Sequence, residues 1–348
     1  MRIWPYILLL VSLVVVAEEV WMQSVPPFVI WPPNDVPSDN RDIRIFYNSG
    51  SLLYMATNWG GAFVTNGQTF ESTIRTFGDN RIPGATDSWY SVQYSYGLCR
   101  STNAGIYWQS LGSGGTNWLN VACGGAKGEV VLSMPYAGYA VLSTNWGQSW
   151  SAITAAPAAQ WRGAFVSTNG AVLALCGANQ QVWMSWNTGQ SWAAKTPPQS
   201  SPSAIVCSQD GTNIFLAVTF KSCYRSGDAG ASWTQINAIP PYQNNELGLR
   251  CSTDFKHIYL IQVNTEYTNT MLWHSHDAGT NWSSAVYPSN KYNTALYAST
   301  DGKYLVFVGQ VSGTNVLLGS KDYGSTIELI DPTSKTRFGV FVWVGILK

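Results

Sequence analysis

The chain has 348 residues, of which 45% are hydrophobic and only 11% are charged. This composition excludes an intrinsically disordered chain, which needs high charge and low hydrophobicity. Basic and acidic residues number 19 each, so no excess positive charge is available to attract nucleic acid or an anionic membrane. Aromatic residues make up 14% and glycines number 32, a mixture typical of short strands and tight turns, and the composition therefore predicts an all-β fold.

The first element in chain order is an export signal. Arg2 precedes an apolar run over residues 7–16, and small residues lead up to Ala17. This pattern predicts a secretory signal peptide over residues 1–17 that is cleaved after Ala17, since the apolar run is too short to cross a bilayer. An uncleaved anchor is the alternative. After cleavage we expect a secreted protein that inserts into no membrane.

An eight-residue pattern, Ser-x-Asn/Asp-x-Gly-x-x-Trp, recurs downstream roughly every 40–50 residues, and such a fixed period indicates a repeat fold. We call each copy an octet. Complete octets begin at Ser101, Ser143, Ser185, Ser226 and Ser275. A further octet over residues 320–327 lacks the Trp, and residues 65–70 form a shortened copy.

The octet resembles the Asp-box, or BNR, repeat of the sialidase-like β-propellers, and the resemblance covers residues 42–330. It implies a β-propeller with four antiparallel strands per blade. Seven repeats imply seven blades, and a six-bladed ring is the alternative. We expect residues 18–41 to lead into a single propeller domain over residues 42–348, with a strand at residues 25–31 or 338–347 closing the ring.

The octet is expected to be a structural turn rather than a catalytic site. Its Asn or Asp hydrogen-bonds the backbone of its own turn, its Gly adopts the positive φ that the turn demands, and its Trp packs against the sheet. We therefore expect buried Trp rings. The structural octet residues are Asn103, Trp108, Asn145, Trp150, Asn187, Trp192, Asp228, Trp233, Asp277, Trp282 and Asp322.

The face opposite the octets is the expected ligand site, by analogy with the Asp-box families. Its loops are rich in aromatic and amide side chains, which suit stacking on sugar faces and hydrogen bonding to sugar hydroxyls. We therefore predict a carbohydrate-binding module without catalysis, with a glycan or glycoprotein as its partner. For any one ring the alternative is that it seals a contact between blades. The candidate ligand-binding residues are Trp59, Tyr136, Trp161, Arg162, Tyr242, Glu246 and Tyr267, and Tyr139 belongs to the same loop as Tyr136.

A sialidase-like glycosidase is the alternative function. Residues 81–83 match the Arg-Ile-Pro motif of sialidases, although Asn80 replaces the aromatic residue that usually precedes it. Adjacent strand residues point to opposite faces, so a neighbouring nucleophile pair would need an irregular loop. The residues that would serve are Arg81, Arg162 and Arg250 as a carboxylate clamp, Asp87 as the acid, and Glu266 with Tyr267 as the nucleophile pair.

A protein-binding scaffold is the second alternative, because the photosystem II stability and assembly factors are similar exported propellers with this repeat. Those factors bind a partner through a basic patch. Lys and Arg are too few and too scattered here to form such a patch, which leaves a generic protein-binding face.

Cysteines and histidines give no sign of a metal or a cofactor, and we expect neither. The six cysteines contain no CxxC pair, and their even number permits disulfides, with buried free thiols as the alternative. His257, His274 and His276 form no metal-ligating set on the expected ligand face, since His276 lies inside an octet.

Overall fold

The computed structural model describes residues 43–329, apart from short gaps at 47–52, 58–61, 66–69, 74–76, 82–88, 94–96, 102–108, 112–117, 126–127, 136, 178–180, 219–221, 241–247, 264–268, 289–295, 300 and 312–313. Side chains are described largely from Leu98 onward. The expected signal peptide and the two candidate closing strands, at 25–31 and 338–347, lie outside the described residues. No helix of the described part is long and apolar enough to span a membrane.

The described residues form strands and turns without any helix, which confirms the all-β prediction. Each sheet has four antiparallel strands that follow one another along the chain. The first three sheets are β1 (Ile43–Phe46), β2 (Leu53–Thr57), β3 (Ala62–Thr65) and β4 (Phe70–Thr73); β5 (Phe77–Arg81), β6 (Trp89–Gln93), β7 (Gly97–Ser101) and β8 (Gln109–Ser110); and β9 (Trp118–Gly124), β10 (Val130–Pro135), β11 (Val141–Ser143) and β12 (Ser151–Ala152).

Four more sheets follow in the same order. They are β13 (Trp161–Val166), β14 (Leu173–Gly177), β15 (Val182–Ser185) and β16 (Ala193–Lys195); β17 (Pro202–Cys207), β18 (Ile214–Val218), β19 (Cys223–Ser226) and β20 (Thr234–Ile236); β21 (Gly248–Cys251), β22 (Ile258–Val263), β23 (Asn269–Ser275) and β24 (Ser283–Pro288); and β25 (Leu296–Ala298), β26 (Leu305–Val311), β27 (Thr314–Ser320) and β28 (Glu328–Leu329). We number the sheets first to seventh in chain order.

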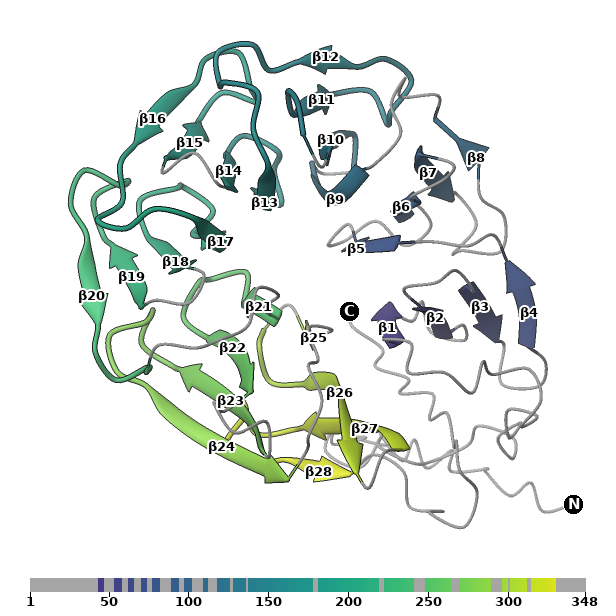
Figure 1. Cartoon of the computed structure of the whole chain (residues 1–348), viewed down its shortest axis with the longest axis vertical. Coiled ribbons are helices and arrows are strands. Elements are labelled where there is room, and N and C mark those ends of the chain that lie inside the picture. Colours follow the sequence, from purple (N-terminus) through teal and green to yellow (C-terminus); the bar gives the residue numbers. More distant parts are fainter. Residues whose placement is uncertain are drawn as a thin grey trace, which may run out of the picture.

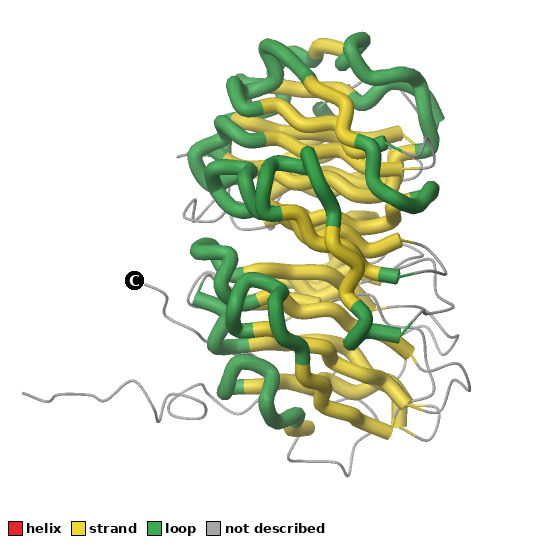
Figure 2. The backbone as a smooth tube through the Cα atoms, turned by 90° about the vertical axis from the view of Figure 1, so that its left-hand side faces the viewer, coloured by secondary structure: helices red, strands yellow, loops and turns green. Residues whose placement is uncertain are grey.

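The sheets are arranged radially, with the first strand of each nearest the centre and the fourth at the rim (Figure 1). Each innermost strand contacts the next one around the ring, and β1 of the first sheet contacts β25 and β26 of the seventh. Because the strands are antiparallel, turns alternate between two faces. We call the face with the octets and the turns between first and second strands (A–B turns) the octet face, and the opposite one the loop face. The described turns lie mainly along one edge in the side view (Figure 2).

Apolar second strands explain how the sheets pack. All five residues of β14 and of β18 are buried, as expected for strands covered on both faces. The hydrophobic clusters extend across neighbouring sheets: Leu132 of the third sheet packs with Leu173 of the fourth, and Phe215 of the fifth packs with Leu260 of the sixth. The core therefore lies between sheets, and each sheet depends on its neighbours for burial.

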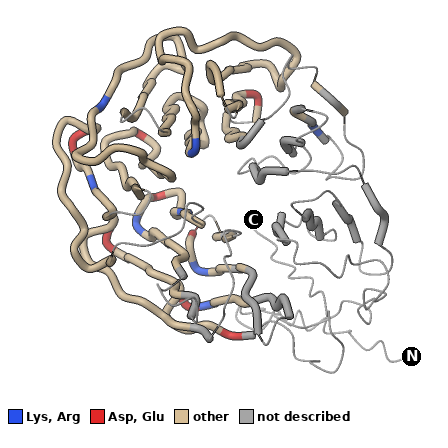
Figure 3. The backbone as a smooth tube through the Cα atoms, viewed as in Figure 1, with Lys and Arg blue, Asp and Glu red and all other residues tan. Residues whose placement is uncertain are grey.

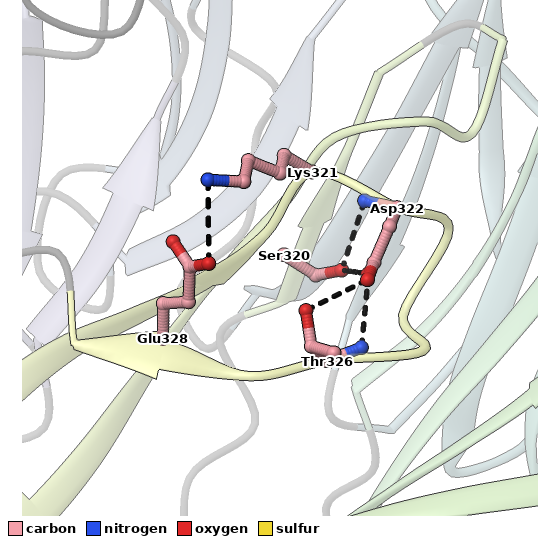
Figure 4. A network of polar contacts seen from close by, with 5 residues as sticks. All are labelled: Ser320, Lys321, Asp322, Thr326 and Glu328. Carbon is pink, nitrogen blue, oxygen red and sulfur yellow. Dashed lines mark hydrogen bonds and ion pairs between the residues drawn. The ribbon is translucent and has the colours of Figure 1, made fainter.

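Side-chain hydrogen bonds hold each described octet in one conformation. Asn145 Oδ1 accepts from Ser149 N at 3.0 Å, and Ser143 Oγ accepts from Gly147 N at 2.8 Å while donating to Asn145 Oδ1. The same bonds recur in the octets at residues 185–192, 226–233, 275–282 and 320–327. Figure 4 shows Asp322 receiving donors from Ser320 and Thr326 in the last of these.

The octet turn has two residues with positive φ, whereas the sequence predicted a positive φ at the Gly alone. The residue before the Gly also has a positive φ, 54° at Thr188 and 59° at Tyr323, and Gln190 N donates to Asn187 O across the turn. Two successive left-handed residues define a type I′ turn. The first of them points its N–H back at the A–B turn of its own sheet, as Thr188 N does to Ala171 O at 2.9 Å. A residue other than Gly in the left-handed conformation costs about 1–3 kcal/mol, and this hydrogen bond helps to offset that cost.

The four octet Trp rings that the structure describes, at Trp150, Trp192, Trp233 and Trp282, are half-buried rather than buried, which corrects the expectation from sequence. Their indole N–H groups bond the Gly carbonyl of the same octet at 3.0–3.1 Å at Trp150, Trp192 and Trp282. Each ring packs on the preceding sheet, as Trp282 does on Phe215 with ring centroids 4.9 Å apart. The octet therefore closes its own turn and also seals the contact between two sheets.

The cysteines of the core are free thiols. Cys123, Cys176, Cys207, Cys223 and Cys251 form no disulfide, and four of them are buried. Burial raises the pKa of Cys176 to about 12, because a thiolate is poorly solvated there. Of the two alternatives that the sequence left open, these five residues follow the buried-thiol one.

We predict that Trp192→Ala lowers the free energy of unfolding by about 2 kcal/mol. Removing a fully buried Trp costs about 3–5 kcal/mol, and a half-buried ring loses less. Urea unfolding at neutral pH measures the change. Gln190→Ala is the control, since Gln190 is exposed in the same octet and only its backbone takes part in the turn, so we expect a change within about 0.5 kcal/mol. Equal stability of Trp192→Ala and wild type would contradict the sealing role.

Candidate functional site

The described aspartates of the octet face all accept hydrogen bonds within turns. Asp228 accepts hydrogen bonds from Ser226 Oγ, Ser232 N and Ser232 Oγ, and these donors lower its pKa to about 2. At Asp277 partial burial raises the pKa, but hydrogen bonds from Asn281 and Ser275 outweigh it and the net shift is downward. Carboxylates held ionised in this way are turn components and poor general acids.

The A–B turns contain a second recurring network that the sequence analysis did not identify. Ser167 Oγ donates to Asn169 Oδ1 and accepts from Val172 N, and Ser167 N donates to Val172 O. The same pattern recurs at Ser208, Ser252 and Ser299, with Asp in place of Asn. The repeated Ser-x-Asn/Asp spacing after each innermost strand was the signal that could have revealed it. These turns engage Asp210, Asp254 and Asp301.

On the loop face, a backbone bridge joins a loop of the third sheet to the segment that leads into the fourth. Gly138, in the loop between β10 and β11, forms an antiparallel bridge with Ala159, in the connection to β13. Trp161 Nε1 donates to Gly138 O at 3.0 Å, and its ring is only 1% exposed. Trp161 therefore ties the loop of one sheet to the next and has no free ring face, contrary to its assignment as a stacking residue.

Among the described residues of this loop, Tyr139 is an exposed aromatic residue. Its side chain is 46% accessible, while Ala140 beside it is completely buried. The bridge at Gly138 fixes the backbone on one side of Tyr139, and the buried Ala140 fixes it on the other. An exposed ring on a fixed backbone can receive an apolar surface at low entropic cost.

Arg162 and Arg250 lie at different depths along the innermost strands. Arg162 occupies a bulge at the start of β13, where the pairing passes from Trp161 to Gly163, and Arg250 lies near the end of β21. Relative to the A–B turn serines, Arg162 is five residues before Ser167 and Arg250 two residues before Ser252. Three residues of strand correspond to about 10 Å, so the two start at opposite ends of their strands and do not form a clamp at one level.

Arg81, the third member of the expected clamp, lies toward the face opposite the expected ligand site. Arg81 is the last residue of β5, at the octet-face end of that strand. The other candidate residues lie outside the described residues: Trp59, Asp87, Asn103, Trp108, Tyr136, Tyr242, Glu246, Glu266 and Tyr267.

Three histidines come together on the octet face. His276 Nδ1 lies 3.0 Å from His257 Nδ1, and His276 Nε2 lies 3.0 Å from His274 Nδ1. Both ring nitrogens of the central residue are thus directed at different partners, so the three rings do not converge on one point. Within the described residues no group of three or more His, Cys, Asp or Glu side chains is placed to hold a metal ion.

No model of a known protein family and no curated protein matches the sequence. Solved structures do match the fold. An ancestral GH74 enzyme gives a TM-score of 0.55 at 17% identity, over 70% of this chain and 36% of that one. The GH74 xyloglucanase from Xanthomonas campestris gives 0.59 at 15% identity, over 81% and 52%.

YCF48 is also similar. YCF48 from Cyanidioschyzon merolae gives a TM-score of 0.52 at 14% identity, over 82% of this chain and 95% of that one. YCF48 bound to D1 peptide gives 0.54 at 14% identity, over 82% and 94%. The chain thus spans about a third and a half of the two GH74 enzymes but nearly all of the YCF48 chains. All of them are β-propellers, and this likeness assigns the chain a propeller-like fold.

We predict that Trp161→Phe lowers the free energy of unfolding by about 1 kcal/mol, the typical net value of one hydrogen bond, since the ring volume is largely kept. Trp161→Ala should cost about 3–5 kcal/mol, because the ring is fully buried. Urea unfolding of both variants measures the two effects. A Trp161→Ala variant of wild-type stability would contradict the structural role.

We predict that Asp228→Asn makes the melting temperature less dependent on pH between pH 4.5 and 2. The folded-state pKa of Asp228 lies below its ordinary value of 3.8, so its stabilising effect is present above pH 3.8 and is lost as the pH falls toward 2. The variant copies Asn187, which occupies the same place in the octet of the fourth sheet. Melting curves of both proteins across this range test the prediction, and parallel curves would contradict it.

Proposed function

We propose that this chain is a seven-bladed Asp-box propeller that acts as a binding module, with carbohydrate as its ligand and the loop face as its binding surface. The order of the sheets and the contact of β1 with β25 and β26 support a closed ring of seven blades. The octet hydrogen bonds support the Asp-box assignment, since every described octet has the same bonds. The proposal includes the export expected from residues 1–17.

The state of the carboxylates carries the argument for binding over turnover. Glycoside hydrolysis ordinarily requires two carboxyl groups that flank one bond. Every Asp whose side chain is described accepts hydrogen bonds within a turn of the octet face. Arg162 and Arg250, two members of the sialidase-like clamp, lie at different depths. The described residues therefore favour a ligand-binding surface without a catalytic centre.

The ligand class follows from the exposed ring on the loop face. Tyr139 offers an accessible aromatic face on a fixed backbone, together with a hydroxyl group. Sugar rings present apolar C–H faces and hydroxyl groups, which match such a side chain. Charged residues are scattered over the described part of the ring (Figure 3), so an uncharged ligand suits the surface better than a polyanion.

A peptide-binding propeller is the second candidate. The chain spans 95% and 94% of the two YCF48 chains, one of which was solved with a D1 peptide, whereas it spans only 36% and 52% of the GH74 enzymes. A single propeller of YCF48 length is thus compatible with a peptide partner. The same loop face would serve.

A glycan array probed with the full chain tests the proposal. We expect selective binding that weakens about tenfold in Tyr139→Ala, which corresponds to about 1.4 kcal/mol. Trp186→Ala is the matched control, since Trp186 is also an exposed ring, 37% accessible, but lies in an octet on the opposite face. Melting temperatures of both variants show that they remain folded.

Hydrolysis assays separate the alternatives. We expect no release of fluorophore from a sialoside and no shortening of xyloglucan oligosaccharides. Turnover of either substrate would replace the binding module by a glycosidase. Binding to a peptide library without any binding to glycans would instead support the second candidate.

A further inference from the structure

The three histidines described above are the only histidines in the chain. They come from three segments of the sixth sheet: His257 from the A–B turn before β22, His274 from β23, and His276 from the octet. A residue type that is otherwise absent is thus concentrated at one point of the octet face. His is also the side chain whose ordinary pKa lies within the physiological range.

The cluster lies where the sixth and seventh sheets meet. Tyr323, from the octet of the seventh sheet, stacks on His257 with ring centroids 4.5 Å apart and meets His276 edge-on at 6.0 Å. Tyr259 of β22 donates to Gly302 O, in the A–B turn of the seventh sheet, at 2.6 Å. Imidazole rings therefore form part of the contact between these two sheets, which we call the 6–7 seam.

The hydrogen-bond chain sets how many protons the cluster can hold. A neutral imidazole has one donor and one acceptor nitrogen, so the chain His257–His276–His274 forms in either direction when all three are neutral. One added proton makes His276 a donor at both nitrogens, and both bonds persist. A second proton, on His257 or His274, would place N–H against N–H and a positive charge beside another. The closed arrangement therefore accepts one proton and opposes the second.

The surroundings also oppose charge on the rings. His274 is only 7% exposed, and burial followed by the repulsion of His276 lowers its pKa to about 4. Burial likewise lowers the pKa of His257 and of His276. The titratable and charged groups that face the cluster are Asp254, Lys256, Asp277 and Tyr259 of the sixth sheet and Asp301, Asp322 and Tyr323 of the seventh.

These groups partly compensate the rings but do not pair with them. Asp254, Asp277, Asp301 and Asp322 raise the histidine pKa values by their negative charge, yet their oxygens already accept turn hydrogen bonds. The positive charge of Lys256 acts in the opposite direction and lowers the pKa of His257 and of His276. No described carboxylate is hydrogen-bonded to an imidazole, so a second positive charge has no partner to receive it.

We propose that the three histidines are a pH-sensitive latch of the 6–7 seam, which stays closed while the cluster holds at most one proton and opens locally when a second is taken up. Opening separates the like charges and lets water solvate them. The loop face is not involved, so the latch is independent of the proposed ligand site.

The direction of the effect follows from the direction of the pKa shifts. All three histidines bind protons less readily in the folded state than in the unfolded chain, where the pKa is about 6.5. The stabilisation is therefore complete above pH 6.5 and declines as the pH falls toward 4. The aspartate turns lose their stabilisation only below about pH 4, so the two processes occupy separate ranges.

The fifth sheet provides a matched control without histidine. Asn213 stands where the sixth sheet has His257, and Gly227 stands where it has His276, with the same turn hydrogen bonds around each. The variants His257→Asn and His276→Gly therefore install residues that this fold already accepts at the equivalent positions. Either should break the chain of rings while preserving the turns.

Hydrogen exchange between pH 7 and 4.5, corrected for the intrinsic pH dependence, tests the latch. We expect protection of the Tyr323 and Gly302 amides, which donate to Lys303 O and Ser299 O, to fall at least tenfold over this range. The Ala229 and Gly211 amides of the fifth sheet serve as internal controls and should keep their protection. In His257→Asn, protection of the seventh-sheet amides should no longer differ from that of the fifth-sheet amides in its dependence on pH. Unchanged protection at Tyr323 in wild type, or an equal fall in the variant, would overturn the proposal.

A titration of the imidazole resonances provides a second readout that does not depend on variant stability. The wild-type protein should show three histidine signals, of which one at most titrates while the seam is closed. The long-range nitrogen shifts should show His276 protonated at both nitrogens first. Three independent titrations near pH 6.5 would overturn the proposal.

Discussion

No sheet in this ring can bury its own faces, and the rest of the structure depends on that constraint. Strands such as β14 and β18 are apolar on both sides, so each sheet is stable only between two others. Among the described strands, each innermost strand contacts the next one around the ring, and β1 contacts β25 and β26, so neighbouring sheets cover one another. The octet adds to this packing, because its Trp covers the preceding sheet, as Trp282 does on Phe215.

The sequence predicted the sheets well because their signals are local and repeated. The octets were predicted from their spacing and the four antiparallel strands per unit were implied by the resemblance, and the structure places the described octets between third and fourth strands. Trp161 was assigned wrongly for a physical reason: an aromatic residue in a connecting segment looks the same in sequence whether its ring is exposed or its N–H bonds a carbonyl 23 residues away. The histidine cluster was missed because turns of one sheet bring together residues that sequence spacing does not relate.

The octet face contributes mainly to the architecture, and the proposed binding surface lies on the opposite face. On the octet face, the described serine hydroxyls and aspartate carboxylates of the turns form hydrogen bonds within those turns. On the loop face, the described part has the exposed ring of Tyr139, a bulge at Arg162 and a bridged loop, and it is there that we propose the binding surface. This division explains why the best-defined motif of the sequence says most about architecture and least about activity.

The bond from the left-handed octet residue to the A–B turn has a consequence for how the protein can change. In the third to seventh sheets this bond, such as Ala278 N to Lys256 O at 3.0 Å, couples the lengths of two turns on the same face, so an insertion in either would displace the other. A designer who wished to graft a foreign peptide into an octet or an A–B turn of these sheets would therefore have to keep it in register with the partner turn of the same sheet.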